Sequence, residues 1–175
     1  MNSTIRIGIV GAGEMGQRHA KLVADSNIAV MAGFADPDPS VALNPVFAKV
    51  RHYRDHLKLI KAETPDGIII AAPNAHHVPV AIDCLAAGIP VLLEKPVADS
   101  VESGRTLVAE QRKSGVTVLV GHHRRFDPAV DATRRLINDG SIGQLLAVQT
   151  TWVTRNPENY YQVKWRTDRS SGGFI

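Results

Sequence analysis

The chain has 175 residues, which is enough for one full domain and part of a second. Of these residues 44% are hydrophobic and 21% charged, and the net charge is +3, as in an ordinary globular protein. The densest basic run is only residues 122–125, which excludes a basic surface with interleaved aromatics for nucleic acid, and no stretch reaches the roughly 18 apolar residues of a membrane span. The single Cys84 excludes an internal disulfide framework. The first residues lack the pattern of a signal peptide, so we expect a cytoplasmic protein.

Apolar runs alternate with helix signals along the first 120 residues. In chain order, the pattern predicts a strand at 5–10, a helix at 14–24, strands at 29–36 and 50–54, a helix at 56–62, a strand at 66–72, a helix at 76–87, a strand at 89–94, a helix at 99–114 and a strand at 116–121. Asn74 is a candidate cap for the third helix, and Asp99 with Glu102 has the spacing of a capping box for the fourth. Several strands are apolar throughout, which is typical of a parallel sheet covered on both faces, so the predicted fold class is α/β with a doubly wound sheet.

The character of the sequence changes after residue 121. Residues 129–139 predict a helix that ends at Gly140, whereas residues 144–153 alternate apolar and polar side chains. Such alternation is typical of a strand with one buried face in an antiparallel sheet. We therefore predict a first domain at residues 1–123 and the beginning of an α+β domain at residues 124–175, which we expect to be truncated.

A glycine-rich turn follows the first predicted strand. Gly11, Gly13 and Gly16 have the spacing G-x-G-x-x-G, and they stand between a strand and a helix as a dinucleotide fingerprint requires. The first glycine permits the tight turn, the second lets the backbone approach a pyrophosphate, and the third lets helix and strand pack closely. The phosphates then face the helix N-terminus, so Glu14 and Met15 are also predicted to lie at the cofactor.

Asp36 ends the second predicted strand, 20 residues after Gly16. An acid at this place accepts hydrogen bonds from the adenosine ribose and repels a 2′-phosphate, so the sequence predicts NAD in preference to NADP. The alternative is that the glycines only make a tight turn and that Asp36 opens a proline-flanked loop. The strand–turn–helix context favours the dinucleotide.

An acid, a base and a proline interrupt the chain where the fifth predicted strand ends. Ligands of open α/β sheets bind outside the carboxyl ends of the strands, and Lys95 lies just beyond such an end. Because successive strand residues point to opposite faces, Glu94 and Lys95 cannot both face the crevice. A lysine there could exchange a proton with a substrate hydroxyl. Local sequence alone leaves this role and a solvated surface ion pair equally open.

Several motifs carry a resemblance to a known family. Pro73, Asn74 and His77 form a Pro-Asn-x-x-His stretch, and a Glu-Lys-Pro follows at residues 94–96. Further blocks, in order along the chain, read GIVGAGEMGQRHA with His19, VGHHRRFDPAV, IGQLLAVQTTWV and WRTDRSSGGF. With these motifs the sequence closely resembles the glucose–fructose oxidoreductase, inositol dehydrogenase and rhizopine-catabolism family (Gfo/Idh/MocA) over essentially its whole length.

The resemblance implies a dinucleotide-binding Rossmann domain followed by a larger antiparallel-sheet domain. It implies that Lys95 is catalytic, near the nicotinamide and the reacting hydroxyl, with a cis bond before Pro96. The implied activity is NAD(P)-dependent hydride transfer to or from a sugar, cyclitol or related polyol, in a homo-oligomer that assembles through the C-terminal sheet. Beyond the glycine turn and Asp36, the cofactor-binding residues that it implies are Pro73, Asn74, His77, Glu94, Lys95, Pro96 and, at the domain junction, Arg125.

The sequence departs from the family pattern at its end. Members continue after the Gly-Gly stretch into a helix that carries an acid and a histidine of the catalytic constellation, and this sequence stops at Ile175. A dinucleotide-binding fragment without turnover of its own is therefore the alternative function. No metal is expected, because the histidine pairs at 76–77 and 122–123 lack the carboxylate or cysteine spacing that would complete a site.

Overall fold

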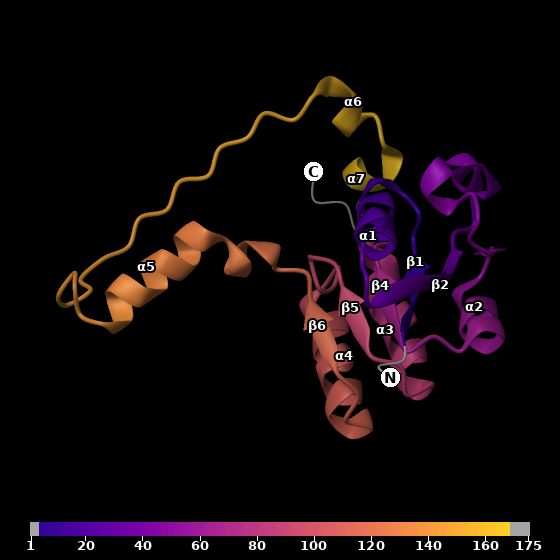
Figure 1. Ribbon diagram of the computed structural model, residues 1–175. Coiled ribbons are helices and arrows are strands. Elements are labelled where there is room, and N and C mark those ends of the chain that lie inside the picture. Colours follow the sequence, from indigo (N-terminus) through magenta and orange to yellow (C-terminus); the bar gives the residue numbers. More distant parts are fainter. Residues whose placement is uncertain (1–3, 169–175) are drawn as a thin grey trace. The chain divides into compact units, whose positions relative to one another are not determined.

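The computed structural model describes residues 4–168, and within them the side chains of Asn159, Lys164 and Trp165 are not described. Six parallel strands form one sheet in the order β3-β2-β1-β4-β5-β6, and Figure 1 shows their labels from β6 to β2 in this order. The strands are β1 (Ile5–Val10), β2 (Ala29–Ala35), β3 (His52–Tyr53), β4 (Gly67–Ile70), β5 (Val91–Leu93) and β6 (Val118–Val120). The predicted doubly wound α/β sheet is therefore confirmed.

Helices cover both faces of this sheet. They are α1 (Glu14–Ala24), α2 (His56–Glu63), α3 (His77–Ala86) and α4 (Val101–Ser114), with short 3₁₀ turns η1 (Pro39–Leu43), η2 (Pro45–Phe47) and η3 (Asn74–His76). One apolar cluster joins α2, α3 and α4 to one face, and a second joins α1 and η2 to the other. The strands are apolar on both faces because both faces are packed.

The second face of the sheet is covered unevenly. Parallel register aligns Ile9, Ile69, Leu92 and Leu119 in one row across β1, β4, β5 and β6. Ile9 is 0% exposed and Ile69 is 8% exposed, Leu92 is half-buried, and Leu119 at the edge strand is 60% exposed. Cover by α1 and η2 thus thins from the centre of the sheet toward β6.

Two helix starts differ from the sequence prediction. The N-cap of α4 is Ser100, whose hydroxyl oxygen accepts the backbone N–H of Ser103 at 3.1 Å, so the capping box predicted for Asp99 and Glu102 is wrong. Serine and aspartate compete for the same capping role when they are adjacent in sequence. At α3 the N-cap residue is His76, whose side chain makes no capping hydrogen bond, whereas Asn74 belongs to the preceding turn η3 and is buried.

The chain divides into two compact units, one that contains residues up to Gly121 together with the stretch from Trp165, and one at His122–Lys164. The second unit holds η4 (His123–Phe126), α5 (Pro128–Asn138) and α6 (Glu158–Tyr161), whereas α7 (Lys164–Thr167) runs from this unit into the first. The division of domains between residues 123 and 124 stays a prediction. Among the residues that the structure describes, no helix is long and apolar enough to cross a bilayer.

The strand predicted at residues 144–153 is wrong, since the structure has no strand there. Strand geometry requires a neighbour for its ladder, and two strands alone are marginal in water. Within the described residues the second unit contributes helices and turns but no strand that could pair with this segment. The segment is exposed along its length, although the Arg124 guanidinium lies 3.7 Å from the ring centroid of Trp152.

Candidate functional site

The glycine turn adopts the geometry that its spacing predicts. Gly11 has a φ of +88°, and a Cβ there would lie 2.6 Å from the backbone of Ala71. A Cβ on Gly16 would overlap the carbonyl oxygen of Gly11, so α1 can pack this closely only without a side chain. At Gly13, the N-cap of α1, a Cβ would meet no atom of residues 4–168 within 4 Å. The turn thus has two glycines required by the fold and one that leaves the backbone open to a ligand.

Side chains hold the residue in the middle of the turn by both of its backbone groups. The N–H of Ala12 donates to Oδ2 of Asp36 at 2.8 Å, and its carbonyl oxygen accepts from Nε2 of Gln17 at 3.0 Å. Oδ1 of Asp36 accepts the N–H of Asp38 at 2.9 Å. Each carboxylate oxygen keeps a further lone pair, so Asp36 can fix the turn and still accept a ribose hydroxyl. The sequence did not indicate Gln17, whose contact needs the folded turn.

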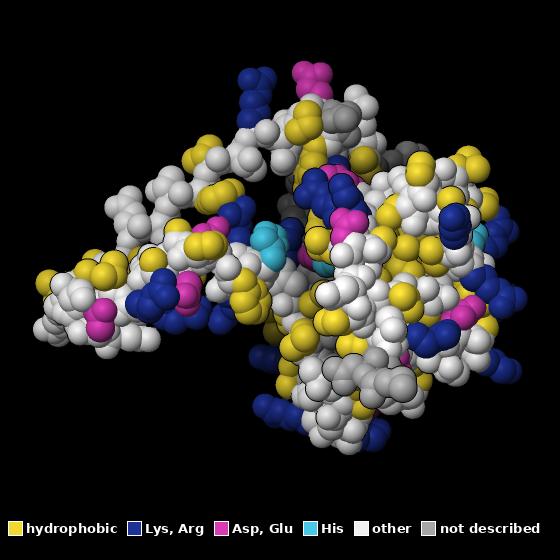
Figure 2. Space-filling model, in the orientation of Figure 1, with side chains coloured by type: hydrophobic (Ala, Val, Ile, Leu, Met, Phe, Trp, Pro, Cys, Tyr) yellow, Lys and Arg dark blue, Asp and Glu magenta, His cyan; other side chains and the backbone are white. Residues whose placement is uncertain are grey.

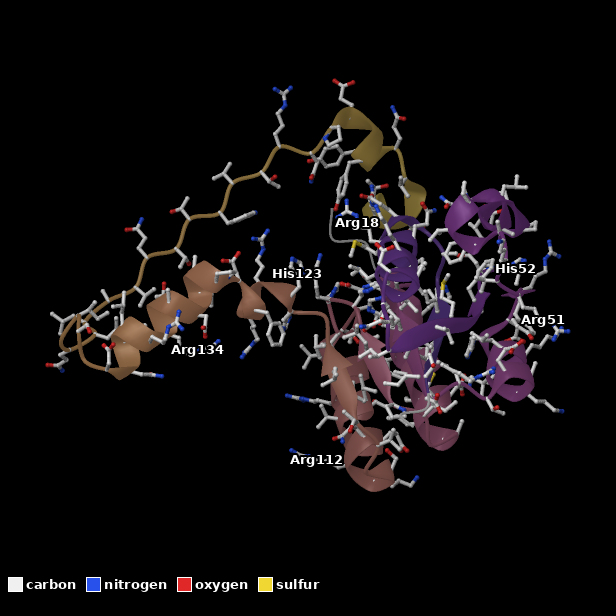
Figure 3. The ribbon with its side chains drawn as sticks, in the orientation of Figure 1. Arg18, Arg51, His52, Arg112, His123 and Arg134 are labelled. Carbon is white, nitrogen blue, oxygen red and sulfur yellow. The ribbon has the colours of Figure 1, made fainter. Side chains whose placement is uncertain are left out.

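Further polar contacts surround this turn. Glu14 forms ion pairs with Arg18 at 2.6 Å and with Arg166 of α7 at 3.5 Å, and Figure 3 labels Arg18 on α1. His52, also labelled, is within hydrogen-bond distance of the carbonyl oxygen of Asp36 at 2.9 Å. Sequence reasoning missed Arg166, since more than 150 residues separate it from Glu14.

The carboxyl ends of four neighbouring strands bring most of the predicted residues to one edge of the sheet. Gly11 follows β1, Asp36 follows β2, Ala71 to Pro73 follow β4, and Glu94 with Lys95 follows β5. Because all strands are parallel, these segments share one edge. Arg125 lies in η4 of the second unit, so its relation to this edge stays a prediction.

Glu94 is buried in the domain, with hydrogen-bond contacts on both of its carboxylate oxygens. It is 6% exposed, and its Oε1 lies 2.9 Å from Nε2 of His19 on α1, while its Oε2 accepts the N–H of Lys95 at 3.1 Å. Gly121 after β6 gives it room, because a Cβ there would lie 3.1 Å from the carboxylate. The hydrogen bond from His19, with the Lys95 amide, holds the pKa of Glu94 below its ordinary value of 4.5, although burial alone would raise it.

We expect Glu94→Gln to lower the free energy of unfolding at neutral pH by about 1.5–3 kcal/mol, the usual contribution of a hydrogen bond to a charged group. Because the folded-state pKa of Glu94 is depressed, its stabilisation is present above pH 4.5 and is lost as pH falls through the folded-state pKa. The gap between wild type and variant should therefore shrink in acid. Urea unfolding from about pH 7 to about pH 3 measures it, and a gap of constant size would contradict the assignment.

His77 is buried at 1% exposure between the loops that follow β4 and β5. Its Nδ1 lies 2.7 Å from the carbonyl oxygen of Pro96, and its Nε2 lies 2.8 Å from that of Ala72. Both ring nitrogens thus face the backbone, so His77 can act on a cofactor only through the loops that it contacts. The peptide bond between Lys95 and Pro96 is cis, which confirms the expectation from the family resemblance.

Lys95 itself is exposed, at the start of the loop that follows β5, and a shallow hollow of about 400 Å³ lies farther along the chain. The hollow is lined by Val97, Ala98, Asp99, Ser100, Val101 and Gly104. A proton-exchanging amine must reach its substrate, and an exposed lysine at a strand end satisfies that requirement. Over residues 4–168, the structure shows no group of three or more histidine, cysteine or acidic side chains that could hold a metal ion.

Comparison with known sequences gives the same family as the motifs. A family model described as an oxidoreductase family with an NAD-binding Rossmann fold matches residues 5–122. The rhizopine catabolism protein MocA of Rhizobium meliloti is 34% identical over 90% of this chain and 50% of its own length. Inositol 2-dehydrogenase of Corynebacterium glutamicum (strain R) is also 34% identical, over 96% of this chain and 51% of its own length. The chain therefore spans about half the length of these relatives.

Comparison with solved structures agrees with this result. Scyllo-inositol dehydrogenase from Lactobacillus casei, with bound NAD(H) and scyllo-inositol, has a TM-score of 0.75 and 26% identity, over 81% of this chain and 43% of that one. The WlbA dehydrogenase from Bordetella pertussis, in complex with NADH and UDP-GlcNAcA, has a TM-score of 0.75 and 25% identity, over 80% of this chain and 43% of that one. With its parallel sheet, glycine turn and matching sequence, the chain belongs to the Gfo/Idh/MocA family of oxidoreductases with an NAD-binding Rossmann fold.

Proposed function

We propose that this chain binds NAD at the carboxyl edge of its sheet and takes part in hydride transfer between the nicotinamide and a hydroxyl-bearing carbon of a cyclitol, sugar or related polyol. The observation that carries the proposal is the edge of the sheet that Gly13 and Lys95 share. Gly13, where the backbone is open, follows β1, and the exposed Lys95 follows β5, with only β4 between these two strands. Relatives named inositol 2-dehydrogenase, and a related structure with NAD(H) and scyllo-inositol bound, support the substrate class.

Each end of the cofactor has candidate partners. The N–H groups at the start of α1 would receive the pyrophosphate, and Asp36 would accept the adenosine ribose hydroxyls. Lys95 would take the hydroxyl proton as the carbon is oxidised and return it in the reverse direction. When bound, NAD supplies the carbon that accepts the hydride. Pro73, Asn74 and Arg125 remain proposed contacts along the cofactor.

Titration of the chain with NADH, followed by a screen of inositols and sugars for NAD reduction, tests this proposal. Binding with reduction supports it in full, whereas failure to bind NADH refutes it. Binding without reduction supports the second candidate, a dinucleotide-binding unit that does not turn over alone. The observation that favours this second candidate is the length of the chain, about half that of its curated relatives.

We expect NAD to bind at least about tenfold more tightly than NADP, a difference of ~1.4 kcal/mol. The carboxylate of Asp36 would face a 2′-phosphate, and neither neighbour in sequence, Ala35 or Pro37, offers a cation. Calorimetric dissociation constants for both cofactors measure the preference. Equal or tighter binding of NADP would remove this role from Asp36. Asp36→Asn should narrow the preference for NAD over NADP and should also weaken NAD binding. The substitution replaces one of the two oxygens that accept a backbone N–H with an amide NH2 group, which cannot accept it.

We also infer that the chain self-associates through residues 144–153. This segment carries no charged residue, no proline and no glycine, and its exposed side chains include Leu146, Val148 and Trp152, the last at 71% exposure. Figure 2 shows further apolar side chains along α5 of the same unit. Unpaired, uncharged extended segments invite pairing with another chain. Light scattering should detect oligomers that Val148→Lys disperses, and a wild type that is monomeric at all concentrations would defeat this inference.

A further inference from the structure

Lys95 stands between two residues that buried or nearly buried histidines hold in place. On one side, Glu94 is bound by His19, whose side chain is only 15% exposed and which comes from α1, 75 residues away in sequence. On the other side, the carbonyl oxygen of Pro96 faces Nδ1 of His77 from α3. The exposed lysine therefore has fixed neighbours, each anchored to a different helix and on a different face of the sheet.

The contact from His19 reaches the backbone of Lys95 in two steps. A carboxylate can only accept, so Nε2 of His19 donates to Oε1 of Glu94. The other oxygen of Glu94 accepts the N–H of Lys95 at 3.1 Å. A buried carboxylate with one firm donor keeps one orientation, and its second oxygen then fixes the amide beside it.

The contact from His77 fixes the far side of the lysine. Its two ring nitrogens face two carbonyl oxygens, at 2.7 Å and 2.8 Å, and a carbonyl oxygen only accepts. A neutral imidazole donates to one of them at a time, whereas a protonated ring donates to both. In either form the ring spans the loop after β4 and the loop after β5, and it joins Ala72 to Pro96.

We propose that His19 and His77 are positioning residues that together hold Lys95 at the nicotinamide end of the crevice, His19 through the Glu94 carboxylate and His77 through the Pro96 carbonyl. This proposal rests on the proposed function, in which Lys95 exchanges the substrate proton beside the nicotinamide. Neither histidine contacts the cofactor in this scheme. Both act on the backbone of the turn that carries the lysine.

Paired substitutions test each anchor without removing its polarity. The amide nitrogen of glutamine can replace Nε2 of a histidine, and that of asparagine can replace Nδ1. His19→Gln should therefore keep the bond to Glu94, and His19→Asn should lose it. At position 77 the pattern reverses, because His77→Asn keeps the donor toward Pro96 and His77→Gln keeps the one toward Ala72. His56→Asn is the matched control. Nε2 of His56 lies 2.8 Å from a carboxylate oxygen of Asp83, and neither residue belongs to the turn that carries Lys95.

Two measurements on the 175-residue chain read the result. The first is hydrogen exchange at the amide of Lys95, which NMR resolves. The second is the ratio of affinities for NADH and ADP by calorimetry, since ADP lacks the nicotinamide half. We expect His19→Asn and His77→Gln each to raise the exchange rate of the Lys95 amide about tenfold and to lower the affinity for NADH about tenfold. The affinity for ADP should stay within about twofold of wild type. His19→Gln, His77→Asn and the control should stay near wild type in both readings.

Contrary outcomes are distinct for the two proposals. The positioning role is overturned if the Lys95 amide exchanges equally fast in the asparagine and glutamine variants of each histidine. It is also overturned if the affinities for NADH and ADP fall in parallel. A parallel loss would indicate that the histidines only support the fold. A wild type that binds neither nucleotide refutes the proposed function instead, and Lys95 exchange across the paired variants then decides by itself whether the two histidines hold the turn.

Discussion

Replacing Gly16 with alanine is expected to destabilise the chain by about 3 kcal/mol or more and to abolish NADH binding. A Cβ at this position would overlap the carbonyl oxygen of Gly11, which is backbone and cannot move aside as a side chain can. Helix α1 would have to shift away from β1, and the donors at its N-terminus would leave the site that the phosphates require. Urea unfolding without ligand and fluorescence titration with NADH measure the two effects.

Gly13→Ala is the matched control for this prediction. A Cβ at Gly13 has no neighbour within 4 Å in the described part of the chain, so the ligand-free stability should stay within about 1 kcal/mol of wild type. NADH binding should still weaken, because a methyl group then stands where the backbone approaches the pyrophosphate. A Gly16→Ala variant as stable as the Gly13→Ala variant would contradict the packing that we describe.

Lys95→Ala is expected to lower the rate of NAD-dependent polyol oxidation by about 10²–10⁴-fold, the usual contribution of a positioned acid–base group. The amine is exposed at the end of β5, and its removal leaves no other lysine in the stretch from Glu94 to Ser100. NADH affinity should change far less than turnover. The measurement is kcat with the best substrate of the screen, in the chain or in a longer form that turns over.

Lys113→Ala supplies the control for charge alone. Lys113 lies in the last turn of α4, with its side chain 78% exposed and 3.5 Å from Glu110, so its loss should leave the rate unchanged. Full activity of Lys95→Ala would return Lys95 to the status of a solvated surface cation. Equal losses in both variants would point to net charge and not to a positioned amine.

Local patterns in the sequence predicted the parts of the site that depend on the backbone. Gly11 and Gly16 are needed where the chain turns and packs closely, and Asp36 and Lys95 follow strands whose apolar runs are unmistakable. A strand end gives the edge of the sheet on which a residue lies, because all six strands are parallel. Such information is contained within about ten residues of each position.

Contacts between distant elements could not be predicted in this way. The pairing of His19 with Glu94 depends on how closely α1 approaches the end of β5, and no local pattern reports that distance. The strand predicted at residues 144–153 is wrong for a related reason. Alternating apolar and polar residues form a strand only when a neighbouring strand supplies the backbone hydrogen bonds. In both cases the deciding information lies in a partner that local sequence does not contain.

The uneven cover of the sheet implies that its strands do not share one resistance to local unfolding. Around Ile9 and Ile69 the centre is sealed on both faces, so its amides open only when the whole domain unfolds. At the margin, Leu119 is 60% exposed and β5 is the one strand that pairs with β6 in the described part of the chain, so we expect β6 to open locally while the rest stays folded. Glu94 lies under Gly121 at the end of that strand, so each such opening would briefly admit water to the carboxylate.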